Sequence, residues 1–334
     1  MTSPTAQRSR GIAPAASPSP ATAKVRKKPT IAHRAEYYTM RAILGVLRKM
    51  SWESACRVGE RLGVLGYRPF GIRKRVVEKQ IAAAFPNLDH AGVKTLAEKS
   101  YAHLGRTFVE SALFDKLGKQ GVLDIADEVQ GWEHIDQTLA EGKGIIFVTG
   151  HVGNWELAGA YVAARGIPLD AIARGMANPL TDQYVTHVRE ATGMVIVHDA
   201  DAVRRAPRSL RAGRGVAFIA DQGVLGLAST FVSFFGRPAK TPRGAAVFAL
   251  RFEVPVIFMV ALRKPNGKFR IIVERIEPRP TGDMDQDVDR IVAEFTARLE
   301  HWVREEPAQY FWQHRRWRRQ PPGTPPELRD PSAD

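Results

Sequence analysis

The 334-residue sequence has a single cysteine, Cys56, which excludes an internal disulfide framework and fits a reducing compartment. A lone thiol without a matching nucleophile motif is more typical of a packed side chain than of a catalyst. No apolar run reaches 18 residues, so the sequence gives no clear transmembrane helix. The N-terminus is basic but has no apolar core segment, which argues against a cleavable signal peptide.

Several familiar functional motifs are missing as well. The sequence contains no G-x-S-x-G elbow for a serine nucleophile, and no G-x-G-x-x-G opens a helix after a strand. It also lacks H-E-x-x-H and any Cys/His metal cluster. No RRM, KH, helix-turn-helix or zinc signature is present, which argues against a nucleic-acid-binding module.

Negative charge is scarce relative to positive charge. The chain has 49 Lys and Arg against 35 Asp and Glu, a formal charge of +14. Such an excess attracts polyanions, which include nucleic acid, an anionic membrane surface and an acidic protein or substrate. Composition does not choose among them, but the excess lies at the two ends: residues 1–35 contain no acid, and the C-terminal part reads "QHRRWRRQ".

The sequence divides into four predicted regions. Residues 1–33 are rich in Pro, Ala and Ser and are predicted to form a disordered basic tail. Helical patterns fill residues 34–126, which we interpret as a membrane-associating region. Residues 127–320 are predicted to form the α/β core, and residues 321–334 a flexible C-terminal tail.

An amphipathic helical pattern opens the second region. Apolar side chains recur at helical spacing at Met40, Ile43, Leu44, Leu47 and Met50. Basic side chains lie on the other face at Arg41, Arg48 and Lys49. The pattern fits a helix on a membrane surface, and it fits equally a helix packed on its own domain with a solvated basic face.

After Gly131, short β-branched runs alternate with helical segments. The predicted strands are 144–149, 168–174, 194–198, 216–221, 255–262 and 269–277. A long loop is expected after the fourth strand, followed by a helix from Thr241. Strands that alternate with helices predict an α/β fold with a largely parallel sheet covered on both faces.

The stretch "GIIFVTGHVGNWELAG" places His151 and Glu156 where a strand gives way to a helix. Ligands of such sheets bind at the carboxyl ends of strands. Gly153 permits a tight turn and Asn154 is a good N-cap, so His151 can fold back over the first helical turn toward Glu156. A carboxylate that is hydrogen-bonded to one imidazole nitrogen fixes the tautomer and supports the positive charge gained when the other nitrogen takes a proton. The second nitrogen can then act as a general base. The plainer alternative is a polar loop histidine and a glutamate that complements the helix dipole.

A base without a protein nucleophile suggests that the substrate supplies the nucleophile, most simply a hydroxyl. "HVGNWE" resembles the H-x4-[DE] motif of glycerolipid-type acyltransferases and, as H-x-x-N-W-E, the bacterial lipid A late (lauroyl/myristoyl) acyltransferases. The resemblance spans roughly residues 36–320. Further blocks follow in the family's order: "ARGMANPLTDQYVTHVRE", "FIADQG", "VSFFGRPAKTPRGAAVFALRFEVPVIF" and "PAQYFWQHRRWRRQP".

The resemblance implies a glycerol-3-phosphate acyltransferase-like fold and a peripheral or monotopic location on the cytoplasmic face of the inner membrane. It implies transfer of a fatty acyl group from acyl carrier protein or a CoA thioester to a hydroxyl of a phosphorylated glycolipid. His151 is then the base and Glu156 its charge-orienting partner, without a covalent intermediate. No metal or organic cofactor is implied, and the expected partners are anionic membrane lipids rather than nucleic acid.

The resemblance also implies substrate-binding residues. Arg174 falls at a basic position near an acceptor phosphate or the developing oxyanion, with a rim salt bridge as the alternative. Asn178 belongs to the same block, although it can equally be a helix N-cap. Asp221 and Gln222 match the family's acceptor-binding position, and a capped loop explains them too. Thr241 matches a loop that lines the acyl pocket, where a helix start is the alternative.

Two readings of function differ from a lipid A acyltransferase. The same chemistry can serve another acceptor, such as a phosphatidylinositol mannoside or a lysophospholipid. From a different class, the +14 charge alone fits a non-catalytic nucleic-acid-binding module.

Overall fold

A computed structural model describes residues 28–223 and 226–333. Most of the predicted N-terminal tail lies outside the described residues, and the first helix begins at Ile31, before the predicted boundary at residue 34. The helical region comprises α1 (Ile31–Leu47), α2 (Trp52–Tyr67), α3 (Lys74–Ala84), α4 (His90–Ala112) and α5 (Phe114–Asp124). The first strand follows from Ala126, close to the expected start of the α/β region.

The central sheet has the strand order β1-β9-β8-β2-β5-β3-β4. Its strands are β1 (Ala126–Gln130), β2 (Ile145–Thr149), β3 (Leu169–Ala173), β4 (Met194–His198), β5 (Gly215–Ile219), β8 (Val256–Arg263) and β9 (Phe269–Ile276). Strands β8, β2, β5, β3 and β4 are mutually parallel. Strand β9 runs antiparallel to β8 and pairs in parallel with β1. The predicted largely parallel α/β sheet is confirmed.

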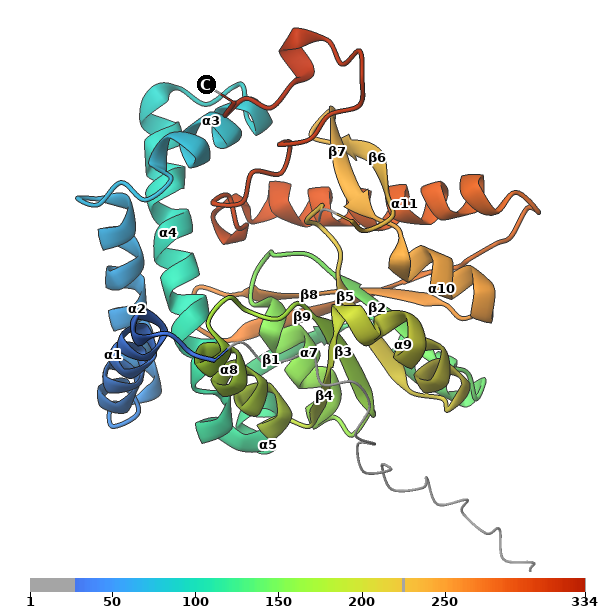
Figure 1. Ribbon diagram of the computed structural model, residues 1–334, viewed down its shortest axis with the longest axis horizontal. Helices are drawn as coiled ribbons and strands as arrows, with labels where there is room; N and C mark the ends of the chain where they lie inside the picture. Colours follow the sequence, from blue (N-terminus) through green and yellow to red (C-terminus); the bar gives the residue numbers. More distant parts are fainter. Residues whose placement is uncertain (1–27, 224–225, 334) are drawn as a thin grey trace, which may run out of the picture.

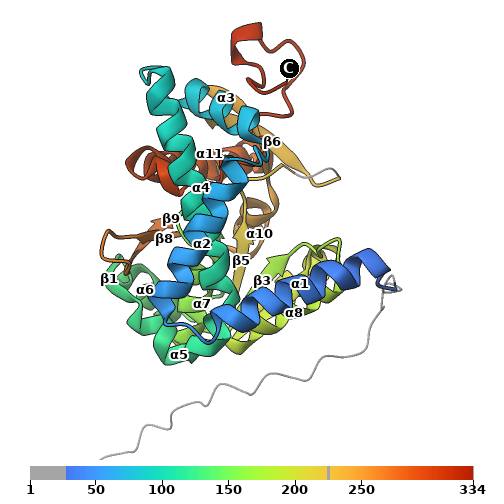
Figure 2. The ribbon, with the colours of Figure 1, turned by 90° about the vertical axis from the view of Figure 1, so that its left-hand side faces the viewer.

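Helices cover both faces of this sheet (Figure 1). One face carries α9 (Ala202–Arg211), α10 (Gly244–Phe252) and α11 (Met284–Glu305), and the other carries α5, α6 (Glu133–Ala140), α7 (Trp155–Ala164) and α8 (Pro179–Ala191). Because these strands are buried on both faces, their sequences are continuous apolar runs. Figure 2 shows α2 and α4 side by side next to the sheet, with α1 lying along α8.

Glycines allow α2 and α4 to touch backbone to backbone. A Cβ on Gly63 would lie 2.0 Å from the carbonyl oxygen of Tyr101, and one on Gly105 would lie 2.1 Å from that of Gly59. Both distances are far shorter than any real carbon–oxygen contact, so a larger residue at either position would force the helices apart. The two helices therefore form a tightly packed pair beside the sheet.

The expected long loop after β5 contains a hairpin instead. Strands β6 (Ser229–Phe234) and β7 (Arg237–Pro242) pair antiparallel around the two-residue turn Phe235–Gly236. Both turn residues have positive φ, 51° and 70°, as a tight hairpin turn requires. A phenylalanine rarely adopts this conformation, so the residue types at this position did not indicate a turn. Thr241 consequently lies in β7, and helix α10 begins only at Gly244.

Helix α1 ends at Leu47, so Met50 of the predicted apolar face lies beyond it, and the side chain of Ser51 caps α2. On α1, Leu44 and Leu47 are buried, whereas Ile43 is 45% exposed although it belongs to the predicted apolar face. Arg48 pairs with Asp115 at 2.7 Å instead of facing only solvent. No helix in the described part of the chain is long and apolar enough to cross a membrane.

Cys56 is fully buried in α2, as expected for a packed side chain. Burial raises the pKa of its thiol to about 12, so the thiol stays protonated at physiological pH.

Candidate active site

His151 and Asp221 meet at the carboxyl edge of the sheet. Strands β2 and β5 are parallel neighbours, and their last residues, Thr149 and Ile219, are paired in register. His151 and Asp221 each lie two residues beyond this pair. The imidazole Nδ1 of His151 is 2.6 Å from Asp221 Oδ1, and the backbone N–H of His151 donates to Asp221 Oδ2 at 3.0 Å. One carboxylate therefore fixes both the ring and the backbone of the histidine.

Asp221 is ionised throughout the physiological range. Burial alone would raise the pKa of this carboxyl, but the charge of His151 and hydrogen bonds from its ring and backbone lower the pKa to about 2. The proton of a neutral His151 imidazole therefore belongs on Nδ1, where it is donated to Asp221. This leaves Nε2 as the basic nitrogen. The amide of Gln222 lies beside the same ring, with its Nε2 3.2 Å from Nδ1.

Glu156 has a different partner from the one that the sequence suggested. Its carboxylate accepts two hydrogen bonds from Arg189 of α8, at 2.8 Å from Nε and 2.5 Å from Nη2. Burial raises the pKa of Glu156, but Arg189 outweighs burial and the net pKa lies below its usual value. Asp221, rather than Glu156, thus makes the expected hydrogen bond to His151, because the ring turns toward β5 while α7 carries Glu156 toward α8.

The turn between the two residues has the predicted construction. Gly153 has φ of +61°, and a Cβ there would lie 2.0 Å from the carbonyl oxygen of Ala261. Asn154 is the N-cap of α7, and its Oδ1 accepts from the backbone N–H of Leu157 at 3.0 Å. The sequence signals for a glycine turn and an asparagine cap are both confirmed.

Two aromatic side chains flank the imidazole of His151. Its ring centroid is 4.9 Å from that of Trp155 and 5.7 Å from that of Phe311. The backbone N–H of Phe311 donates to the carbonyl oxygen of His151 at 2.9 Å. Phe311 belongs to the block "PAQYFWQHRRWRRQP", but no role was predicted for it. Its only local signal was an aromatic cluster, which is also typical of core packing.

A cavity of about 540 Å³ extends from His151 into the protein. Strands β2 to β5 form one wall and helices α7 and α8 another. It reaches from Arg174, just after β3, to Leu169 at the start of that strand and Met194 at the start of β4. Five residues of extended chain correspond to roughly 16 Å. Gly159 lies on the α7 wall, where an added Cβ would be 2.9 Å from Met194 Sδ.

The remaining predicted site residues divide into two groups. Arg174 and Gln222 line the cavity together with His151 and Glu156. Arg174 is exposed, and within residues 28–223 and 226–333 its guanidinium makes no hydrogen bond or ion pair.

Asn178 and Thr241 do not line this cavity. Asn178 caps α8 through Leu180 and donates to the carbonyl oxygen of His33 at 2.9 Å. Thr241 is fully buried, and its hydroxyl accepts a hydrogen bond from Arg316 at 2.6 Å. For Asn178 this is the predicted alternative, a helix cap. Thr241 lies within β7, so it neither lines the cavity nor starts a helix, and both expectations for it were wrong. In the described part of the chain, no group of three or more His, Cys, Asp or Glu side chains is placed to hold a metal ion.

The sequence matches the profile of bacterial lipid A biosynthesis acyltransferases over residues 24–319. The chain belongs to this family. The predicted resemblance is thereby confirmed, and the match begins earlier than the expected residue 36. The protein is therefore an acyltransferase of the lipid A biosynthesis family.

Curated relatives carry several acyl specificities. The chain is 26% identical over 285 residues to the lipid A biosynthesis lauroyltransferase of Escherichia coli (strain K12), covering 85% of this chain and 91% of the relative. It is 24% identical over 287 residues to the palmitoleoyltransferase of the same organism, covering 84% and 91%. A phosphatidylinositol mannoside acyltransferase of Mycobacterium tuberculosis (strain ATCC 25618 / H37Rv) is 28% identical over 127 residues, covering 36% and 40%.

The His151–Asp221 pair generates a prediction about catalysis. Asp221→Asn keeps the size of the side chain but removes the charge that supports an imidazolium, so we expect kcat for acyl transfer to fall ~10²–10⁴-fold. His151→Ala should lower kcat at least as far. Steady-state kinetics measure both effects, and circular dichroism melting checks that the variants fold.

The double variant distinguishes a dyad from two independent residues. Residues that act as a unit lose their effect together, so His151→Ala combined with Asp221→Asn should be no slower than His151→Ala alone. If the two fold-reductions multiply instead, the two residues do not act as a unit.

Proposed function

We propose that the protein transfers a fatty acyl group from a thioester of acyl carrier protein or CoA to a hydroxyl of a lipid A precursor or a related phosphorylated glycolipid. The observation that carries the proposal is the combination of a His–carboxylate pair with a deep, largely apolar cavity. The cavity begins at the base and runs along the strands, which suits a linear acyl chain with its thioester beside His151. The names of the relatives support the lipid A acceptor.

In the proposed reaction, Nε2 of His151 removes the proton from the acceptor hydroxyl as its oxygen attacks the thioester carbonyl. The new C–O bond forms, the C–S bond breaks, and the departing thiolate takes the proton from the imidazolium. Asp221 stabilises the imidazolium in between. Ser111 and Thr149 also line the cavity, but their hydroxyls donate to Asn154 and to the backbone rather than to His151, which supports direct transfer.

Glu156 has a supporting role in this scheme. Its carboxylate lies in the cavity wall and its negative charge acts on His151, while the fork of Arg189 keeps it ionised and in place. It thus adds a second negative charge near the imidazolium without contacting the ring nitrogens. Removing that charge by Glu156→Gln is expected to slow transfer severely.

The relative that acylates phosphatidylinositol mannoside favours a second candidate acceptor. That match covers 40% of the relative, against 91% for the lauroyltransferase. We therefore place the lipid A precursor first and keep the mannoside as the alternative.

Membrane attachment is proposed for the helical region. Side chains of α1, α2 and the turn after α2 are apolar yet exposed: Ile31, Tyr38, Ile43, Val46, Leu62, Leu65, Phe70 and Ile72. Basic residues accompany them in the same segment. This combination suits peripheral or monotopic binding to anionic lipid, and the cytoplasmic face of the inner membrane is the location proposed for it.

Vesicle binding tests this placement. Each basic side chain near an anionic surface contributes about 1 kcal/mol, and salt screens this part only. We therefore expect high salt to weaken but not abolish cosedimentation with vesicles of anionic phospholipid. Binding that ignores both salt and lipid charge would contradict the proposal.

The acyltransferase activity is tested by incubating the purified protein with thioesters of graded chain length and hydroxylated glycolipids, and weighing the products. Gly159→Leu should shift the preferred acyl chain toward shorter lengths, because the added side chain occupies the cavity beside Met194. Gly244→Leu is the control, since Gly244 starts α10 on the opposite face of the sheet and has open space around it. Absence of transfer from every donor would refute the proposal, and an unchanged length preference would refute the cavity assignment.

Arg174 is proposed to hold a phosphate of the acceptor, because it lies at the cavity mouth, unpaired among the described residues. Arg174→Ala should then raise the acceptor KM several-fold and leave the donor KM unchanged. Arg174→Lys should recover only part of the loss, since an ammonium lacks the bidentate fork. A collapse of kcat by ~10²–10³ at unchanged acceptor KM would assign Arg174 to the oxyanion instead.

A further inference from the structure

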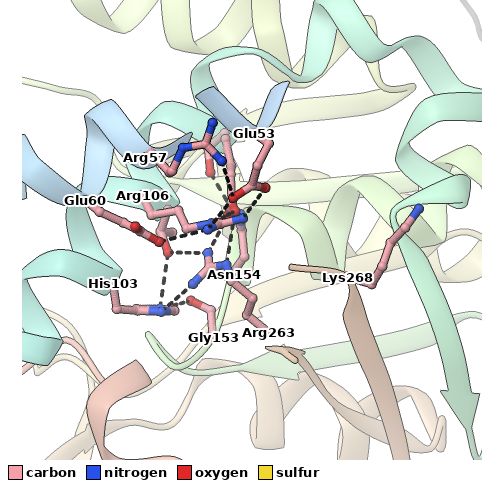
Figure 3. Close-up of polar contacts among 12 residues, drawn as sticks. Glu53, Arg57, Glu60, His103, Arg106, Gly153, Asn154, Arg263 and Lys268 are labelled. Carbon is pink, nitrogen blue, oxygen red and sulfur yellow. Dashed lines mark hydrogen bonds and ion pairs between the residues drawn. The ribbon is translucent and has the colours of Figure 1, made fainter. Parts of the chain in front are cut away.

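A buried charge cluster lies directly behind the active-site turn. Figure 3 shows Arg106, Arg263 and His103 converging on the turn that carries Gly153 and Asn154. At its centre is Glu110 of α4, which is fully buried. Its carboxylate accepts from Arg106 Nε at 2.9 Å, from Arg263 Nε at 3.0 Å and from Asn154 Nδ2 at 3.0 Å.

Asn154 makes more contacts than a helix cap requires. Capping uses only its Oδ1, which accepts from the backbone N–H of Leu157. The second half of the amide, Nδ2, donates to Glu110. Serine or aspartate would cap the helix as well as asparagine, but neither provides this N–H donor. The hydrogen bond from Asn154 to Glu110, here called a tie, therefore requires an amide at this position, which lies between His151 and Glu156.

His103 holds the preceding residue of the turn. Arg263 Nη1 lies 2.6 Å from His103 Nδ1, and a guanidinium can only donate, so Nδ1 is the unprotonated nitrogen. His103 Nε2 consequently carries the proton and donates to the carbonyl oxygen of Gly153 at 3.0 Å. Burial, and after it the charge of Arg263, lower the pKa of His103 well below its usual value, which keeps the ring neutral.

Both ties, Asn154 to Glu110 and Gly153 to His103, are supported by residues outside the turn. Arg106 reaches Glu60 at 2.8 Å and Glu53 at 3.1 Å on α2. Arg263 ends β8, and its backbone N–H donates to Gln309 Oε1 at 2.9 Å. The turn is thus held against the tightly packed α2–α4 pair on one side and the sheet on the other.

We propose that Glu110 and His103 are positioning residues for acyl transfer: by holding Asn154 and Gly153 they fix the placement of His151 and Glu156 at the two ends of the turn. The inference rests on the proposed function, in which His151 is the base. Neither residue touches substrate in this scheme. Their effect is geometric, since a displacement of about 1 Å at a reacting group can cost ~10²-fold in rate.

The first test is Asn154→Ser, which retains the cap and removes the tie to Glu110. We expect kcat to fall by about tenfold or more, with the KM of donor and acceptor within about twofold of wild type and the melting temperature little changed. Asp283→Ser is the matched control, because Asp283 caps α11 through Asp285 and Gln286 and is not among the cavity-lining residues. The control should retain the wild-type kcat.

The second test uses a rescue pair at His103. His103→Leu loses the hydrogen bonds to Gly153 and Arg263, and the contact of Nε2 with Thr107 Oγ1 at 3.2 Å, and should lower kcat to a similar extent. His103→Gln offers an N–H to Gly153 and an oxygen to Arg263, so it should restore most of the rate. The acid limb of the pH profile of kcat/KM should not move in the glutamine variant, because Asp221 still supports His151.

Amide hydrogen exchange of the peptide spanning residues 144–159 supplies a readout that does not depend on activity. Asn154→Ser and His103→Leu should both exchange faster there than wild type. If wild type transfers no acyl group, the proposed function fails, and exchange still decides whether the ties hold the turn. Wild-type kcat in folded Asn154→Ser, or wild-type exchange in both variants, would overturn the positioning role. If His103→Leu does not fold, Asn154→Ser alone decides.

Discussion

A hydrogen bond between His151 and Asp221 links the ends of two neighbouring parallel strands, and the rest of the site is arranged around it. Both residues stand at the same offset beyond paired strand ends, so the twist and spacing of the sheet bring them together. The carboxylate then sets the tautomer and leaves Nε2 of the neutral ring unprotonated. The cavity begins at this point because strands and helices diverge there, as they do at the carboxyl edge of open α/β sheets.

Local patterns predicted much of this arrangement. The apolar run before Gly150 predicted strand β2, Gly153 predicted the turn, and Asn154 predicted the helix cap. His151 was correctly assigned to the edge of the sheet. The partner of His151 could not be found in this way. Sequence spacing favoured Glu156, five positions away, whereas Asp221 becomes adjacent only because β5 lies next to β2 although β3 and β4 come between them in sequence. Periodicity does not encode strand order.

The count of 49 Lys and Arg overstates the number of basic side chains that are available at the surface. Several arginines are committed to internal carboxylates: Arg106 and Arg263 to Glu110, Arg189 to Glu156, and Arg214 to Asp170. A planar guanidinium satisfies a buried carboxylate at two points, which a lysine cannot do. Each such pair takes a positive and a negative side chain from the surface together, so it lowers the number of available arginines and leaves nearly all of the +14 net charge in place. The basic residues available to a polyanion are a subset of those counted in the sequence.

The active-site turn is also joined to a segment far along the chain. Val152 forms a β-bridge with Tyr310, and the backbone of Gly153 and His151 bonds to Gln309 and Phe311. During synthesis the histidine emerges long before these partners exist. The turn at His151 cannot make all of its backbone contacts until the segment around Tyr310 has been synthesised and has packed against it. A nascent chain therefore contains the His151 motif before the segment that completes the contacts of its turn has been synthesised.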